Sequence, residues 1–119
     1  MSRDPLARAE EAFETAQAAT DFATIDEAYA EAETLAEQAD ATEGRVLAHR
    51  ARLARQLARK DSRAVDWHER AAARETFEAA VEQAWALADE LGTPDALALA
   101  AGASPRQRSV PTRRARAPR

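Results

Sequence analysis

The two histidines are the first residues to test for chemistry. His68 stands in Asp66-Trp67-His68-Glu69, a run of residue types that can ligate a metal ion. Adjacent residues on a helix do not share a face, however, and the chain contains no Glu-x-x-His or His-x-x-x-His spacing. His49 falls on the polar side of a basic helix. Both are therefore interpreted as solvated surface histidines, and no metal or other cofactor is expected.

Carboxylates are plentiful, but they stand next to like charges, as at Glu27/Glu31 and Glu33/Glu37. Such pairs could collect divalent cations weakly or face a basic partner, and a solvated acidic face is the simpler interpretation. No pair has an evident apolar pocket that would raise a carboxyl pKa for acid–base catalysis. With three glycines and no cysteine, the chain has neither a glycine-rich phosphate loop nor thiolate chemistry. The sequence predicts a protein that is not an enzyme and has no small-molecule substrate.

The strongest functional signal is the arginine content of the C-terminal end. Residues 1–101 carry 11 basic and 21 acidic side chains, whereas residues 102–119 carry six arginines and no acidic residue. We predict a disordered tail over residues 103–119, because this stretch has three prolines and one large apolar side chain. The tail could neutralise nucleic-acid phosphates without reading sequence, rest on the protein's own acidic helices, or serve as a solubilising extension. Its arginines are Arg106, Arg108, Arg113, Arg114, Arg116 and Arg119.

Three large side chains in the body of the chain are candidates for binding a partner. Arg50 lies on an otherwise apolar helical stripe with Val46 and Leu57. There it could bind a partner's carboxylate in a groove, or lay its stem over the core and keep its head in water. Trp67 and Trp85 could be interface anchors, because aromatic residues are enriched at interface hot spots. Packing in the core or at its edge is the alternative for both.

The elements that must position these residues are helices. Alanine fills 33 of 119 positions, and it is the residue that costs least to order in a helix. From Ile25 to Ala39, apolar residues recur at three- and four-residue spacing, and a related stripe returns 52 residues later, from Phe77 to Leu91. Thr24 and Glu27 predict a capping box at the start of the first of these two helices.

Start and stop signals divide the chain into four or five helices. The acidic and basic residues are also sorted along it: residues 10–43 hold eleven acids and no base, residues 45–60 six bases and no acid, and residues 75–95 six acids and no base. A short connection between the second and third helices predicts an antiparallel hairpin with opposite charges along the contact. The expected helices are 5–18, 25–40, about 42–60, one or two over 62–91 starting at Asp61-Ser62, and a short one after Thr93-Pro94.

The segment LADELGTPDALA, Leu87–Ala98, resembles the helix-to-helix corner of tetratricopeptide-type repeats in bacterial regulators. The resemblance implies a stack of helix pairs that serves as a protein-binding scaffold. It covers about a tenth of the chain, and the 52-residue spacing of the two apolar stripes differs from that family's repeat of about 34 residues.

Together these patterns predict an all-α protein of four to five antiparallel helices packed as helical hairpins, in a bundle or a short tetratricopeptide-like stack. One helical domain covers residues 1–102, and the basic tail covers residues 103–119. The predicted function is a small protein-interaction or adaptor module, with acidic helical faces and a basic tail, that binds a protein partner or associates with itself. The alternative is a nucleic-acid-associated accessory or regulatory protein that binds phosphates through the tail.

The sequence also gives an expectation for location. No segment approaches the roughly 20 apolar residues of a membrane-spanning helix. The first thirteen residues, MSRDPLARAEEAF, lack the apolar stretch of a signal peptide. We therefore expect a cytoplasmic protein with no membrane partner.

Overall fold

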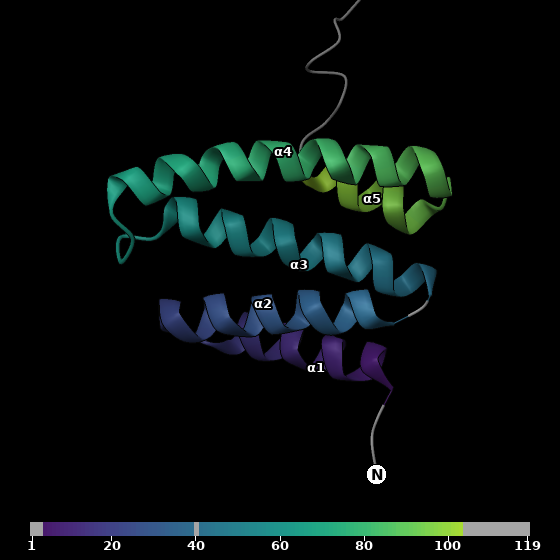
Figure 1. Ribbon diagram of the computed structural model, residues 1–119, viewed down its shortest axis with the longest axis horizontal. Helices are drawn as coiled ribbons and strands as arrows, with labels where there is room; N and C mark the ends of the chain where they lie inside the picture. Colours follow the sequence, from purple (N-terminus) through teal and green to yellow (C-terminus); the bar gives the residue numbers. More distant parts are fainter. Residues whose placement is uncertain (1–3, 40, 104–119) are drawn as a thin grey trace, which may run out of the picture.

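A computed structural model describes residues 4–39 and 41–103 and shows an all-α protein. Consecutive helices pack against one another as hairpins, and α1 and α5 each also touch α3 (Figure 1). The central helix is therefore α3, and the predicted fold class is confirmed. Within the described residues the helices are α1 (Pro5–Ala18), α2 (Phe22–Gln38), α3 (Thr42–Asp61), α4 (Trp67–Leu91) and α5 (Pro94–Ala103).

The start of α2 differs from the predicted capping box. Asp21 is the N-cap residue, and its Oδ2 accepts hydrogen bonds from the Thr24 backbone N–H at 3.0 Å and the Thr24 hydroxyl at 2.8 Å. Thr24 therefore lies inside the first turn, and the predicted start at Ile25 with a Thr24–Glu27 capping box is wrong. The first backbone N–H groups of a helix have no acceptor within the helix. The Asp21 carboxylate, three residues before Thr24, accepts from one of them.

The boundary between α3 and α4 also differs from the prediction. Asp61 is the last residue of α3 and Ser62 its C-cap, so Asp61-Ser62 ends a helix and does not start one. The N-cap of α4 is Asp66, whose Oδ1 accepts from the Glu69 backbone N–H at 2.9 Å. A single helix then runs from Trp67 to Leu91, so of the two alternatives for residues 62–91, one helix is correct. The buried Val65 precedes this helix.

The helices pack closely because their buried side chains are short. Of the 22 buried apolar residues in the described part of the chain, 15 are alanine. Two clusters form: one joins α1, α2 and α3 around Phe13 and Leu35, and the other joins α3, α4 and α5 around Leu53 and Val81. Because α3 contributes to both clusters, it ties the two hairpins together.

Gly44, in the first turn of α3, lies against the end of α2. A Cβ atom added there would lie 2.7 Å from the Ala36 carbonyl oxygen and 2.9 Å from the Ala39 Cβ. These distances are too short for van der Waals contact, so α2 and α3 can approach this closely only because residue 44 has no side chain.

Opposite charges line α3 on both sides, as the sorted sequence predicts. On the α2 side, Nε of Arg55 lies 2.9 Å from Oδ1 of Asp26. On the α4 side, Nη1 of Arg45 lies 2.6 Å from Oε2 of Glu90. Arg52 reaches both neighbours, since it pairs with Glu33 and Glu37 of α2 and donates a 2.8 Å hydrogen bond to Gln83 of α4. Each such pair contributes no more than about 1 kcal/mol, so the pairs select neighbours while apolar burial supplies the stability.

His49 lies among these arginines, and the prediction that it is a solvated surface residue is wrong. The side chain is half-buried, and its Nδ1 atom has no hydrogen-bond partner among the described residues. Burial lowers the pKa of His49 below its ordinary value of 6.5. The positive charges of Arg52 and Arg45 lower the pKa further, while Glu33 acts in the opposite direction.

The predicted domain boundary falls one residue before the end of α5, at Ala103. The rest of the predicted tail, residues 104–119, lies outside the described residues. Among the described helices, none combines the length and hydropathy needed to cross a bilayer.

Gly44→Ala should destabilise the protein by about 1–3 kcal/mol, because the new methyl group has no space between α2 and α3. The matched control is Gly102→Ala in α5, where an added Cβ meets nothing within 4 Å. That substitution should leave stability unchanged or raise it by up to about 1 kcal/mol, because alanine favours the helix. Urea unfolding of both variants measures the difference. Equal stabilities would contradict the close approach at Gly44.

Acidification should destabilise the protein in a window set by His49. Below pH 6.5 the unfolded chain takes up a proton that the folded His49 resists, so stability falls until the pH passes the lowered folded-state pKa. Unfolding curves between about pH 7 and pH 5 should therefore show a smaller loss for His49→Gln than for the unchanged chain. The control is His68→Gln, at an exposed position that stacks on Trp67. Identical pH slopes for all three proteins would rule out His49 as the cause.

Candidate binding groove along α3

The three predicted partner-binding residues lie in different surroundings. The Trp67 side chain is 65% exposed at the start of α4, and its ring stacks on His68 with centroids 3.7 Å apart. The expectation that Trp67 packs in or beside the core is therefore wrong. Trp85 is half-buried and packs against the α3–α4–α5 cluster, as expected for an edge residue. Arg50 is exposed on α3, on the apolar stripe where the spacing placed it.

Arg50 is held over an aromatic ring of α1. Its guanidinium carbon lies 5.6 Å from the centroid of the Phe13 ring, within the range of a cation–π interaction. Phe13 is buried, and Tyr29 of α2 meets its ring edge-on at 5.3 Å. The ring therefore has a fixed position, and it restrains the arginine without occupying the N–H groups at the guanidinium edge.

Arg50 sits in the middle of a groove whose floor is α3. Two adjoining hollows, of about 510 and 500 Å³, share Arg50, Ala98 and Leu99 among their lining residues. We call the combined feature the α3 groove. At one end Glu10 of α1 and residues of α5 line it, and at the other end the lining comes from α3, α5 and Phe77 of α4. It is lined by Glu10, Thr42, Glu43, Val46, Leu47, Arg50, Leu53, Ala54, Leu57, Lys60, Phe77, Thr93, Asp95, Ala98, Leu99, Gly102 and Ala103.

The groove is open because α5 is short. It has 10 residues, against 20 in α3 and 25 in α4, so it covers only part of the surface beside α3. Leu57, which the sequence places on the buried stripe, is 43% exposed there. Leu97 of α5 is 44% exposed as well. Both side chains are exposed among the described residues, so the expectation for Leu57 is wrong.

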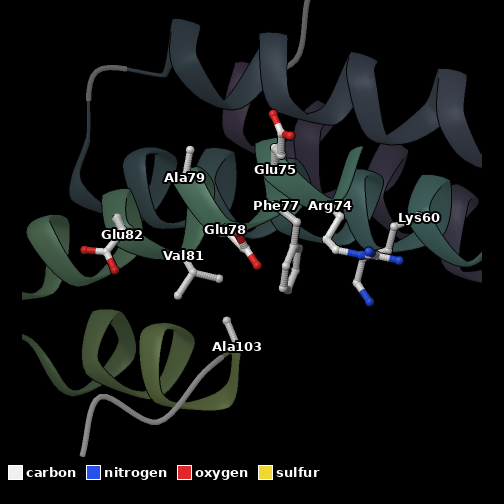
Figure 2. A pocket seen from close by; sticks show the side chains of 9 residues that line it. All are labelled: Lys60, Arg74, Glu75, Phe77, Glu78, Ala79, Val81, Glu82 and Ala103. Atoms are coloured by element: carbon white, nitrogen blue, oxygen red, sulfur yellow. The ribbon is translucent and has the colours of Figure 1, made fainter. Parts of the chain in front are cut away.

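Figure 2 shows a third hollow, of about 820 Å³, on the other side of the end of α5. Phe77 and Val81 project from α4 toward Ala103, and Lys60 and Arg74 lie together beyond Phe77. This hollow shares Lys60, Phe77 and Ala103 with the α3 groove, so the two are continuous. Its lining mixes charges of both signs. Charges of both signs also line the α3 groove, but its half beside Leu53, Leu57 and Leu99 is mostly apolar, so it is the better candidate site.

The charge on Arg50 sets it apart from the other basic residues of α3. Five of the six have a carboxylate within 4.0 Å, namely Arg45, Arg52, Arg55, Arg59 and Lys60. Arg50 has no such partner among the described residues, although Glu10, Glu43 and Asp95 line the same end of the groove. A positive charge on an apolar floor is thus left available for an anionic group.

Other predicted sites find no support in the described part of the chain. Within residues 4–39 and 41–103, no three His, Cys, Asp or Glu side chains are grouped so that they could hold a metal ion. His68 is exposed, as predicted. The six tail arginines lie outside the described residues, so the nucleic-acid alternative stays a prediction from sequence.

Comparison with known proteins adds no family to this description. No protein-family model, curated protein or solved structure matches the chain. The resemblance of Leu87–Ala98 to a tetratricopeptide-type corner therefore rests on that segment and on the coarser feature that the structure shows, five sequential helices packed as hairpins.

Proposed function

We propose that this protein is a small interaction module that holds a segment of a partner protein in the α3 groove. The observation that carries the proposal is the position of Arg50, the one basic residue of the described α3 without a carboxylate partner, on the apolar floor of that groove. An unpaired arginine over exposed leucine favours a ligand that offers both a carboxylate and apolar side chains.

The energetics of the groove support a protein ligand. Burying an apolar side chain contributes about 1.5–3 kcal/mol, and Leu57, at 43% exposure, still has surface to bury. Arginine is enriched at interface hot spots, because a desolvated guanidinium forms strong paired hydrogen bonds with a carboxylate. Phe13 reduces the cost of ordering Arg50 on binding, since the side chain is already restrained over the ring.

The acidic faces predicted from the sequence are partly used inside the protein. Asp26, Glu33 and Glu90 pair with arginines of α3, so these carboxylates hold neighbouring helices in register. Because these carboxylates are already paired within the protein, we place the proposed partner contact in the groove and not on the acidic faces.

Selection of random peptides displayed on phage against the full chain tests the proposal. We expect enrichment of peptides that bind the unchanged chain and bind Arg50→Glu and Leu57→Asp at least about tenfold more weakly, because each change places a negative charge on the groove floor. Fluorescence anisotropy with synthetic copies of the selected peptides gives the affinities.

The matched control is Arg63→Glu, which makes the same charge change at an exposed residue of the loop between α3 and α4. Its affinity for the selected peptides should stay within about twofold of the unchanged chain, because the substituted position lies outside the groove. Failure to enrich any peptide, or binding insensitive to both groove substitutions, would refute the proposed function.

A further inference from the structure

We infer that the α3 groove takes an amphipathic helix of a partner protein, with two carboxylates about three turns apart that meet Arg50 and Lys60. The inference rests on the proposed function and adds the conformation and charge pattern of the ligand. It follows from three features of the groove: the backbone groups it offers, the spacing of its two basic residues, and the charge at its ends.

The walls of the groove favour a helix over an extended segment. Its floor is α3, and its other lining residues come from α1, α4, α5 and the turn before α5, so among the described residues it presents no strand edge to pair with an extended backbone. The N–H and C=O groups of an extended segment would be desolvated against Leu53, Leu57 and Leu99 with few partners, which is costly. A helix satisfies its own backbone hydrogen bonds and presents only side chains to the groove.

The basic residues define where the ligand's carboxylates lie. Arg50 and Lys60 line the same hollow and are ten residues apart on α3, which corresponds to about 15 Å along the helix axis. A helix lying along α3 would place carboxylates at that separation if they are about ten or eleven residues apart. Lys60 already has Asp61 at 3.4 Å and lies over Phe77 at 5.6 Å, so Arg50 is the stronger determinant.

Charge complementarity also identifies the less favourable occupants. The segment 104–119 of this chain has six arginines and no acid, so its charge suits the Glu10, Glu43 and Asp95 end of the groove but not the Arg50–Lys60 half. At the other end of the groove, Glu10, Glu43 and Asp95 favour the positive N-terminus of a ligand helix. The ligand helix would therefore run parallel to α3, with its carboxylates toward the Arg50–Lys60 half.

The test uses two helix-constrained peptides of the same composition and a free N-terminus, each with an apolar stripe and two glutamates. In one peptide the glutamates are about eleven residues apart, and in the other about four, so both pairs share a helix face. Anisotropy titration of the full chain should show at least about tenfold tighter binding of the first peptide, because only that peptide reaches both basic residues. Arg50→Glu should remove this preference, and replacing the matching glutamate of the peptide by lysine should restore binding to the variant.

Two further variants separate a blocked groove from a damaged fold. Gly102→Trp places an indole in the hollow from a position where an added Cβ meets nothing within 4 Å, and it should abolish peptide binding while circular dichroism stays helical. Gly102→Ala is the control and should bind normally. Arg50→Gln removes the charge without reversing it, and it should lose most of the preference between the two peptides.

Several results would overturn the inference. Equal binding of the two peptides, or phage-selected peptides that bind without becoming helical, would reject the helix while leaving the proposed function standing. If a synthetic peptide of residues 104–119 displaces the constrained peptides, the occupant of the groove would instead be this segment of the chain itself. Light scattering that shows a dimer converted to a monomer by Arg50→Glu would assign it to a second copy. If neither constrained nor phage-selected peptides bind, the inference and the proposed function both fail.

Discussion

The close approach of α2 and α3 is the constraint on which the rest of the structure depends. A core built mostly of alanine buries little area per residue, so the helices gain stability only if their backbones come near one another. Gly44 against Ala36 and Ala39 shows how near. At that separation, the arginine side chains of α3 reach carboxylates on both neighbouring helices without leaving the edge of the contact. The sorted charges can therefore act only because the core is made of small residues.

Because α3 is central, different parts of its surface contact different neighbours. One part packs on α2, another packs on α4, and between them lies a ridge of Arg45, His49 and Arg52 that the neighbouring carboxylates neutralise. The groove lies on another part of its surface, bounded by α1 and α5. A basic helix between the acidic α2 and α4 gives opposite charges at both of its main contacts, which favours this arrangement of neighbours. Arg50 takes no part in this pairing, because its guanidinium lies over Phe13 of α1 and not beside the carboxylates of α2 and α4.

Sequence periodicity predicted the helices and their hairpins because the alanine-rich stripes are long and regular. It failed at helix starts, where Asp21 and Thr24, or Ser62 and Asp66, are equally good caps on chemical grounds and only the path of the backbone decides between them. Arg50 could be found from sequence because it interrupts an apolar stripe. The buried Nδ1 of His49 could not, because its surroundings come from three helices. The groove walls were equally out of reach, since α1 and α5 are far apart in sequence.

The length of α5 links the architecture to the proposed site. Over its described length α5 ends at Ala103, and an apolar strip of α3 lines the groove beside Arg50, at the boundary between the two clusters. A segment bound there would contact residues of both clusters and bury surface that the small core leaves exposed. The same shortage of large apolar side chains that makes the fold depend on close packing thus also favours completion of its surface by a partner.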